Sequence, residues 1–226
     1  MMAQNRSTAV MQRRREAHDS LDDFPTPPWA TRALCEWLCR RGEDLPSFTC
    51  REPAANRGHM VRPLREYFAE VAASDVHDYG AGFALRDYLF GPPPPRVHYT
   101  ITNPPFRLAE QFIERAAATS DFGFAVLVRS AFLEGVGRYE RLFRPNPPSH
   151  ILQFTERVVM HRGRLAPKGS SATAYCWVGR YDGGLYQGDP PHFHWLPPCR
   201  KRLERPGDYE TAQPDQPSAA AQEAML

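Results

Sequence analysis

The sequence predicts one α/β domain with a mostly parallel sheet, and three observations indicate it. Residues 122–128 form a continuous apolar run, which is typical of a central parallel strand. Strand patterns alternate with helical patterns through the first two thirds of the chain. Two later strand patterns, 150–154 and 172–178, have no helical pattern between them and predict an antiparallel hairpin at the C-terminal edge. With 226 residues, 42% of them hydrophobic, the chain can bury a substantial core.

The domain is expected to span residues 24–185. Residues 1–23 are polar, without an apolar period, and predict a flexible N-terminal arm. Residues 186–226 are expected to form a Pro-rich extension and a disordered tail, since Pro, Gln, Ala and Glu dominate from residue 200 onward. Within the domain, the stiff segment Phe24-Pro25-Thr26-Pro27-Pro28 precedes a helix, because apolar residues recur from Trp29 to Leu38 at helical spacing.

The next three strand candidates each end at residues suited to a ligand site. The strand at 48–51 runs into the turn 52–58, the strand at 71–75 ends at Asp75, and the strand at 99–102 ends at Asn103. Helical patterns follow the first and third of these strands, and a further helix is expected at 131–143. Since parallel strands end at the same edge of a sheet, a ligand site is expected there.

The segment Asn103-Pro104-Pro105-Phe106 is the strongest candidate for chemistry. The two prolines stiffen the turn, so its carbonyls point outward. The side-chain oxygen of Asn103 and the carbonyl of Pro104 can accept both N–H bonds of an exocyclic amine, while the Phe106 ring stacks on its heterocycle. Two such acceptors favour a tetrahedral nitrogen and stabilise the positive charge that develops as it attacks. The alternative is an ordinary strand-ending turn, because Asn-Pro commonly begins turns.

A second group of residues predicts a nucleoside site at the same edge. The small residues of the turn 52–58 let a ligand approach backbone N–H groups and a helix N-terminus. Asp75 is placed to bind ribose hydroxyls, and Asp87, in the segment 83–90, is placed to accept an amine or ring N–H from adenine.

Taken in order, these motifs resemble the S-adenosylmethionine-dependent amino-methyltransferases, above all DNA adenine-N6 methyltransferases of the phage or prophage type. Asn103-Pro104-Pro105-Phe106 is similar to their (Asn/Asp)-Pro-Pro-(Tyr/Phe) motif, and residues 52–58 to their cofactor loop. Thr26-Pro27-Pro28 resembles the segment that packs on the methionine part of the cofactor. The resemblance covers residues 24–180.

The resemblance implies a Rossmann-like class I methyltransferase sheet and methyl transfer from S-adenosylmethionine to the N6 amine of adenine in DNA. The base would be flipped out of its stack and would attack the methyl group in line, with no metal and no covalent intermediate. The implied catalytic residues are Asn103, Pro104, Pro105 and Phe106. The implied cofactor-binding residues are Thr26, Pro27, Glu52, Pro53, Ala54, Ala55, Asn56, Gly58, Asp75 and Asp87.

The chain departs from this pattern in two places. Asn56 stands where such proteins usually have the first glycine of the loop; Asn tolerates a positive φ, but its side chain would crowd the cofactor carboxylate. No separate target-recognition domain is visible. The basic linker 157–170 is the first candidate for DNA contacts and 129–144 is the second, although the linker equally suits a solvated hairpin. Expected contacts are Arg162, Arg164 and Lys168 to phosphates, and Arg157 to a base.

Two other functions remain open on the sequence. One is the same chemistry on cytosine N4, guanine N2 of ribosomal RNA, or a protein glutamine. The other is a non-catalytic nucleic-acid-binding relative, which the unusual Asn56 favours. The net charge of +2 supplies no strong electrostatic argument for nucleic acid, and the excess of arginine fits either phosphate binding or a GC-rich genome.

The remaining composition points to a reducing compartment. Five dispersed cysteines without a Cys-x-x-Cys pair indicate neither a disulfide framework nor a zinc ribbon. His192, His194 and Cys199 lack a fourth metal ligand, so no metal is expected. No apolar run approaches eighteen residues and no signal peptide is visible, so a cytoplasmic protein without a membrane span is expected.

Overall fold

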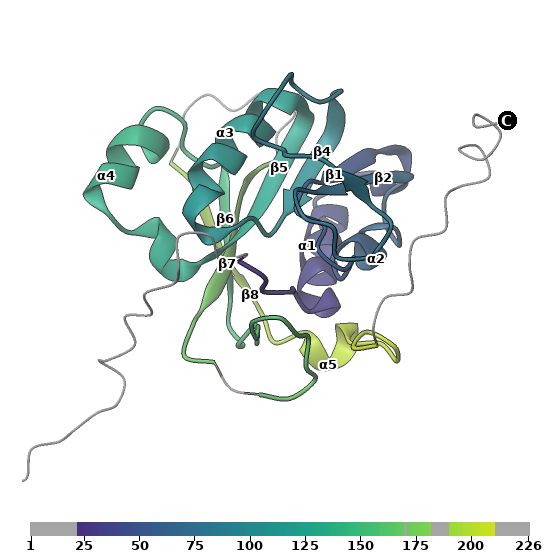
Figure 1. Ribbon diagram of the computed structural model, residues 1–226. Coiled ribbons are helices and arrows are strands. Elements are labelled where there is room, and N and C mark those ends of the chain that lie inside the picture. Colours follow the sequence, from purple (N-terminus) through teal and green to yellow (C-terminus); the bar gives the residue numbers. More distant parts are fainter. Residues whose placement is uncertain (1–21, 170, 182–189, 211–226) are drawn as a thin grey trace, which may run out of the picture.

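The computed structural model describes residues 22–169, 171–181 and 190–210 (Figure 1). Its centre is an eight-stranded sheet with the order β3-β2-β1-β4-β5-β7-β6-β8. All neighbouring strands are parallel except β7, which runs antiparallel to both β5 and β6. The predicted mostly parallel, Rossmann-like sheet is therefore confirmed. The strands are β1 Thr49–Glu52, β2 Glu70–Asp75, β3 Ala84–Leu85, β4 Val97–Thr102, β5 Ser120–Arg129, β6 His150–Phe154, β7 Tyr175–Arg180 and β8 His192–Leu196.

Helices cover the sheet on both faces. In Figure 1, α1 (Pro28–Arg40) and α2 (Val61–Leu64) lie on one side, and α3 (Ala109–Thr119) and α4 (Val136–Arg138) on the other. Burial of β5 on both faces explains the apolar run at residues 122–128. Ala125 and Leu127 belong to the core under α1, whereas Val126 and Val128 belong to the core under α3. The sheet is thus held from both faces, and its carboxyl edge is left for the connecting loops.

The segment 131–143 differs from the single helix that we expected. It contains a 3₁₀ turn at Ser130–Leu133, the short α4 and a π-helical turn at Tyr139–Phe143. Gly135 separates the first two elements with a φ of 110°, a backbone conformation that an α-helix cannot include. Two further 3₁₀ turns lie at Leu45–Ser47 and Phe106–Leu108.

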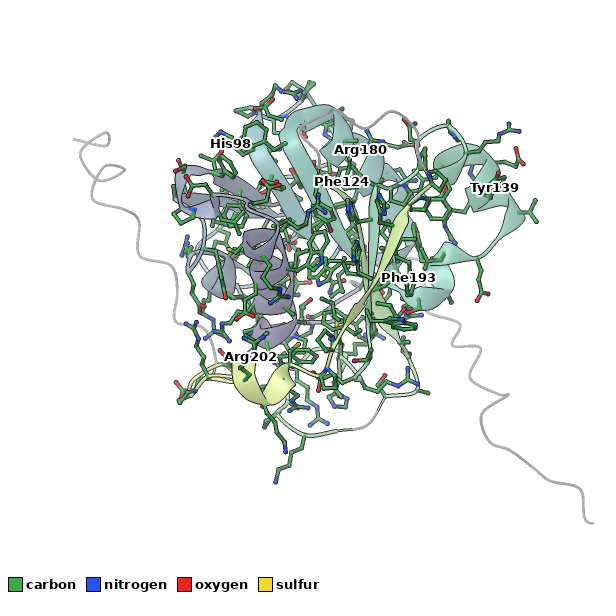
Figure 2. The ribbon with its side chains drawn as sticks, turned by 180° about the vertical axis from the view of Figure 1, so that it is seen from behind. His98, Phe124, Tyr139, Arg180, Phe193 and Arg202 are labelled. Atoms are coloured by element: carbon green, nitrogen blue, oxygen red, sulfur yellow. The ribbon has the colours of Figure 1, made fainter. Side chains whose placement is uncertain are left out.

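Residues 190–210, expected as part of an extension outside the domain, pack on it. Strand β8 pairs with β6 and lies outermost in the sheet, so the antiparallel pair β6–β7 is not at the edge. After β8, α5 (Arg200–Leu203) leads to Asp208, whose carboxylate accepts hydrogen bonds of 2.7 and 2.8 Å from the buried Arg32 of α1. Figure 2 shows this side of the molecule, with Phe193 labelled on β8 and Arg202 on α5. Residues 1–21 of the expected arm (1–23), and residues 186–189 and 211–226 of the expected extension and tail (186–226), lie outside the described residues.

The part of the chain that the structure describes contains no helix long and apolar enough to cross a membrane. Over the same residues, no three His, Cys, Asp or Glu side chains are grouped so that they could hold a metal ion. All five cysteines are free thiols.

Candidate functional site

A cavity lies where β1, β2 and β4 end, and the segment before α1 closes one side of it. Its wall combines four sets of residues from distant parts of the sequence. The first set lies in the segment before α1, the second in the β1–α2 loop, the third in the segments that follow β2 and β3, and the fourth in the turn after β4 together with α3. In chain order, the lining residues are Asp22, Phe24, Pro25, Thr26, Pro53, Ala54, Ala55, Asn56, His59, Met60, Asp75, Val76, Tyr79, Asp87, Tyr88, Leu89, Asn103, Pro105, Leu108 and Phe112.

The orientation of the Asn103 amide is fixed by its neighbours. Its nitrogen donates to the backbone oxygen of Phe24 at 2.9 Å and to the Thr26 hydroxyl at 3.0 Å. Because a carbonyl can only accept, the nitrogen must face Phe24, and the oxygen must face the other way. That Oδ1 atom is buried without a hydrogen-bond partner among the described residues. A buried, unpaired acceptor costs free energy, and because Asn103 also lines the cavity, this oxygen is a candidate for a ligand contact.

The turn after β4 is tied down from several directions. The backbone N–H of Phe106 donates to the Asp22 carboxylate at 2.7 Å. The Phe106 ring lies 5.4 Å from the Phe24 ring, and the guanidinium carbon of Arg129 lies 4.0 Å above its centroid. Asp22 and Phe24 therefore cover the turn, and Arg129 lies on the ring that we expected to stack on a base.

The β1–α2 loop contains the one non-glycine residue with positive φ in the described chain. Asn56 has a φ of 50°, in agreement with its expected tolerance of this conformation. Its backbone N–H donates to Asp75 at 2.9 Å, and its side-chain nitrogen donates to Asp23 at 2.8 Å. Its side-chain oxygen accepts from the backbone N–H of Arg57 at 2.7 Å. The Asn56 amide is thus engaged with Asp23 and Arg57.

Glu52 lies beneath this loop and does not line the cavity. Its Oε1 accepts the backbone N–H of Ala54 at 2.9 Å and the Thr102 hydroxyl at 2.7 Å. Complete burial raises the pKa of Glu52 to about 8, against the lowering effect of these two hydrogen bonds. The carboxyl is therefore largely protonated at neutral pH, and it braces the loop from inside the protein.

The two aspartates beyond β2 and β3 reach the cavity. Asp75 accepts the backbone N–H groups of Asn56 and His77, each at 2.9 Å, while burial raises its pKa. Asp87 is exposed and accepts the backbone N–H groups of Leu89 and Phe90 through a single oxygen, Oδ1. These turns point both carboxylates at the cavity as acceptors for hydroxyl or N–H groups.

Most of the residues singled out in the sequence meet here. Thr26, Pro53, Ala54, Ala55, Asn56, Asp75, Asp87, Asn103 and Pro105 line the cavity, whereas Pro27, Glu52, Gly58, Pro104 and Phe106 are not among its lining residues. Gly58 has a φ of 81°, and a Cβ there would lie 2.9 Å from the Phe83 ring. This glycine therefore serves the packing of the loop.

Sequence reasoning missed several residues of the site. Asp22 and Asp23 were assigned to the arm, although their carboxylates hold Phe106, Asn56 and Arg57. Tyr79 and Tyr88 also line the cavity, and no motif in the sequence singled them out. The one sequence feature that could have indicated Asp22 and Asp23 is their position directly before the stiff segment that begins at Phe24-Pro25.

The basic linker passes beside the site. The Met160 sulfur lies 3.8 Å from the Asn103 side-chain nitrogen, and the backbone N–H of Gly163 donates to the Asp23 carbonyl at 2.8 Å. The four basic side chains expected to contact DNA are all exposed: Arg157, Arg162, Arg164 and Lys168. Four exposed cations on a linker that touches the Asn103 side chain at Met160 leave both the nucleic-acid interpretation and the solvated-hairpin interpretation in place.

No protein-family profile and no curated protein matches the chain, but solved structures do. A putative class I S-adenosylmethionine-dependent methyltransferase from Listeria monocytogenes has a TM-score of 0.57 at 12% identity, over 91% of this chain and 71% of that one. A modification subunit of a putative type I restriction enzyme from Vibrio vulnificus has a TM-score of 0.55 at 16% identity, over 92% of this chain.

A putative RNA methyltransferase from Pyrococcus horikoshii has a TM-score of 0.51 at 16% identity, over 70% of this chain and 86% of that one. The chain spans only about half of the Vibrio subunit, 53% of its length. At these identities the likeness concerns the fold. The chain has the Rossmann-like fold of class I methyltransferases.

Proposed function

We propose that this protein transfers a methyl group from S-adenosylmethionine to the N6 amine of adenine in DNA. The observation that carries the proposal is the fixed Asn103 amide, whose buried oxygen has no partner in the described chain. An exocyclic amine needs such an acceptor at the point of attack. The fold and the ordered residues at its carboxyl edge support the same conclusion.

The residues present fit the cofactor. Asp75 and Asp87 offer carboxylate acceptors on the cavity wall, as ribose hydroxyls and an adenine amine require. Pro53, Ala54 and Ala55 have small side chains, so a ligand can approach the backbone of the β1–α2 loop. The cofactor supplies an electrophilic methyl group. We infer that the chain itself contributes the acceptors that orient the cofactor and the target base. Thr26 packs against the methionine part of the cofactor.

In this mechanism the protein acts by positioning and by fixed dipoles. Asn103 Oδ1 and the Pro104 carbonyl accept the two N–H bonds of the target amine and stabilise the charge that grows on its nitrogen. Phe106 holds the base by stacking. The Phe24 carbonyl and the Thr26 hydroxyl keep the Asn103 amide from rotating. The bond from the amine nitrogen to the methyl group forms as the bond from methyl to sulfur breaks, and the cationic nitrogen is then acidic enough to lose its proton to water. No strong base is therefore required, and proximity supplies much of the rate.

DNA as acceptor is supported by the likeness to a restriction-enzyme modification subunit and by the exposed cations of the linker that contacts Asn103 at Met160. The likeness to a putative RNA methyltransferase keeps RNA as the second acceptor class. We propose Arg162, Arg164 and Lys168 for phosphate contacts and Arg157 for a base contact.

The test is transfer of labelled methyl from S-adenosylmethionine to unmethylated DNA, with the product digested to nucleosides and identified by mass. N6-methyladenine from the wild-type protein, absent with Asn103→Ala while that variant still binds the cofactor, is the expected result. Label found only in RNA or protein would overturn the DNA acceptor. A protein that binds no cofactor would overturn the enzyme altogether.

A further inference from the structure

A second cavity borders the Asn103–Phe106 turn at Phe106. It is lined by Phe106, Ala109, Val128, Arg129, Ala131, Phe132 and Arg138, and it shares no lining residue with the first cavity. Both arginines of this lining lie over aromatic rings. The guanidinium carbon of Arg129 is 4.0 Å from the Phe106 centroid, and that of Arg138 is 4.1 Å from the Phe132 centroid.

These two arginines are held very differently. Arg138 donates to the carbonyls of Phe132 and Glu134, each at 2.8 Å, and to the Glu110 carboxylate at 3.2 Å. Arg129 is exposed and forms no ion pair within the described chain. Its guanidinium lies on the Phe106 ring and donates a hydrogen bond to the Tyr175 hydroxyl. Arg138 is therefore a fixed part of the wall, whereas Arg129 can leave its ring by side-chain rotation once its one hydrogen bond, to Tyr175, is broken.

The position of Arg129 matters because it covers the face of Phe106. The centroid of the Phe24 ring already lies 5.4 Å from that of Phe106. A heterocycle that stacks on Phe106 from the Arg129 side must therefore displace the guanidinium. A guanidinium and a nucleobase are alternative partners for one aromatic face, and the base stack is the stronger of the two when the cation is exposed.

We propose that Arg129 is a placeholder for the acceptor base, which leaves Phe106 when the base arrives and then binds a phosphate beside the extruded nucleotide. The inference rests on the proposed function and adds a positioning residue to it. The exchange has a small net cost in free energy, because the base stack replaces the cation–π contact and a phosphate replaces the Tyr175 hydroxyl as the partner of the guanidinium. The released guanidinium gains a charge-assisted hydrogen bond to the nucleic-acid backbone.

The inference makes opposite predictions for two ligands. For an uncharged nucleoside, Arg129 is only a competitor, so Arg129→Ala should bind it about two- to fivefold more tightly. For a single-stranded oligonucleotide, the variant loses a phosphate contact. Its affinity should fall, and the slope of log K against log salt should shrink by about 0.7.

The experiment is calorimetry on the full chain saturated with S-adenosylhomocysteine, which keeps adenosine out of the first cavity. The probes are 2′-deoxyadenosine and a thymine oligonucleotide with one adenine, titrated into the wild type, Arg129→Ala and the control Arg40→Ala. Arg40 is an exposed arginine on α1, with 58% of its side chain accessible, and both affinities should be unchanged in that control.

Tighter nucleoside binding together with weaker oligonucleotide binding supports the placeholder. If Arg129→Ala binds deoxyadenosine as well as or less well than the wild type, the inference is wrong. It is also wrong if neither probe binds the wild type at millimolar concentration while S-adenosylhomocysteine does. Failure of S-adenosylhomocysteine itself to bind would instead overturn the proposed function, so the two failures are separate.

Discussion

The side-chain nitrogen of Asn56 donates a hydrogen bond of 2.8 Å to the Asp23 carboxylate. This contact joins the β1–α2 loop to the segment before α1, two walls of one cavity that lie far apart in the sequence. It also gives a reason for asparagine at a position with a φ of 50°. Glycine would adopt the conformation but would leave Asp23 with one partner fewer.

The Asn56 contact predicts an order of stabilities. Asn56→Gly keeps the left-handed backbone and loses the Asp23 hydrogen bond. Asn56→Ala loses the same hydrogen bond and keeps a Cβ at positive φ without the side-chain amide that makes this conformation tolerable for asparagine. We expect the free energy of unfolding in urea to decrease from wild type to Asn56→Gly to Asn56→Ala, with about 1 kcal/mol between the variants. An alanine variant as stable as the glycine variant would contradict this.

In calorimetry, Asn56→Gly should keep or tighten S-adenosylmethionine binding.

Local signals explain what the sequence could predict. The strand at 150–154 is confirmed residue for residue, and Asp75, Asp87 and Asn103 reach one cavity because neighbouring parallel strands end at the same edge. Strand β8 was not predicted, since it depends on pairing with β6 about forty residues away. The burial of Glu52 and the arginine stacked on Phe106 likewise depend on tertiary packing, which residue spacing does not reveal.

Thr26 should affect turnover through Asn103. Its hydroxyl accepts the Asn103 amide at 3.0 Å, so Thr26→Val removes one of the two partners that fix the amide, while Thr26→Ser keeps it. We expect Thr26→Val to lower kcat for methyl transfer by about tenfold, equivalent to about 1.4 kcal/mol, and Thr26→Ser to stay near wild type. Steady-state rates at saturating cofactor measure this. Equal losses in both variants would show that the hydroxyl has no such role.

Glu52 should make stability fall as the pH rises. Its folded pKa of about 8 lies above the ordinary value of 4.5, so its contribution is complete below pH 4.5 and is lost as the pH rises toward 8. Glu52→Gln keeps the shape of the neutral acid and cannot ionise. Relative to wild type, the variant should therefore gain stability between pH 5 and pH 8, on the order of 1 kcal/mol or more. Urea unfolding at both pH values tests it, and a constant difference would contradict the raised pKa.

Substitution of Gly58 by alanine should destabilise the protein more than the same substitution at Gly42. Both glycines have positive φ, 81° and 93°, so alanine strains the backbone at each. At Gly58 the new Cβ would also lie 2.9 Å from the Phe83 ring, whereas at Gly42 nothing lies within 4 Å. We expect Gly58→Ala to lower the free energy of unfolding by roughly 1–3 kcal/mol more than Gly42→Ala. It should also weaken cofactor binding, because Gly58 lies in the β1–α2 loop. Equal thermal and chemical stability of the two variants would mean that Phe83 moves aside at little cost.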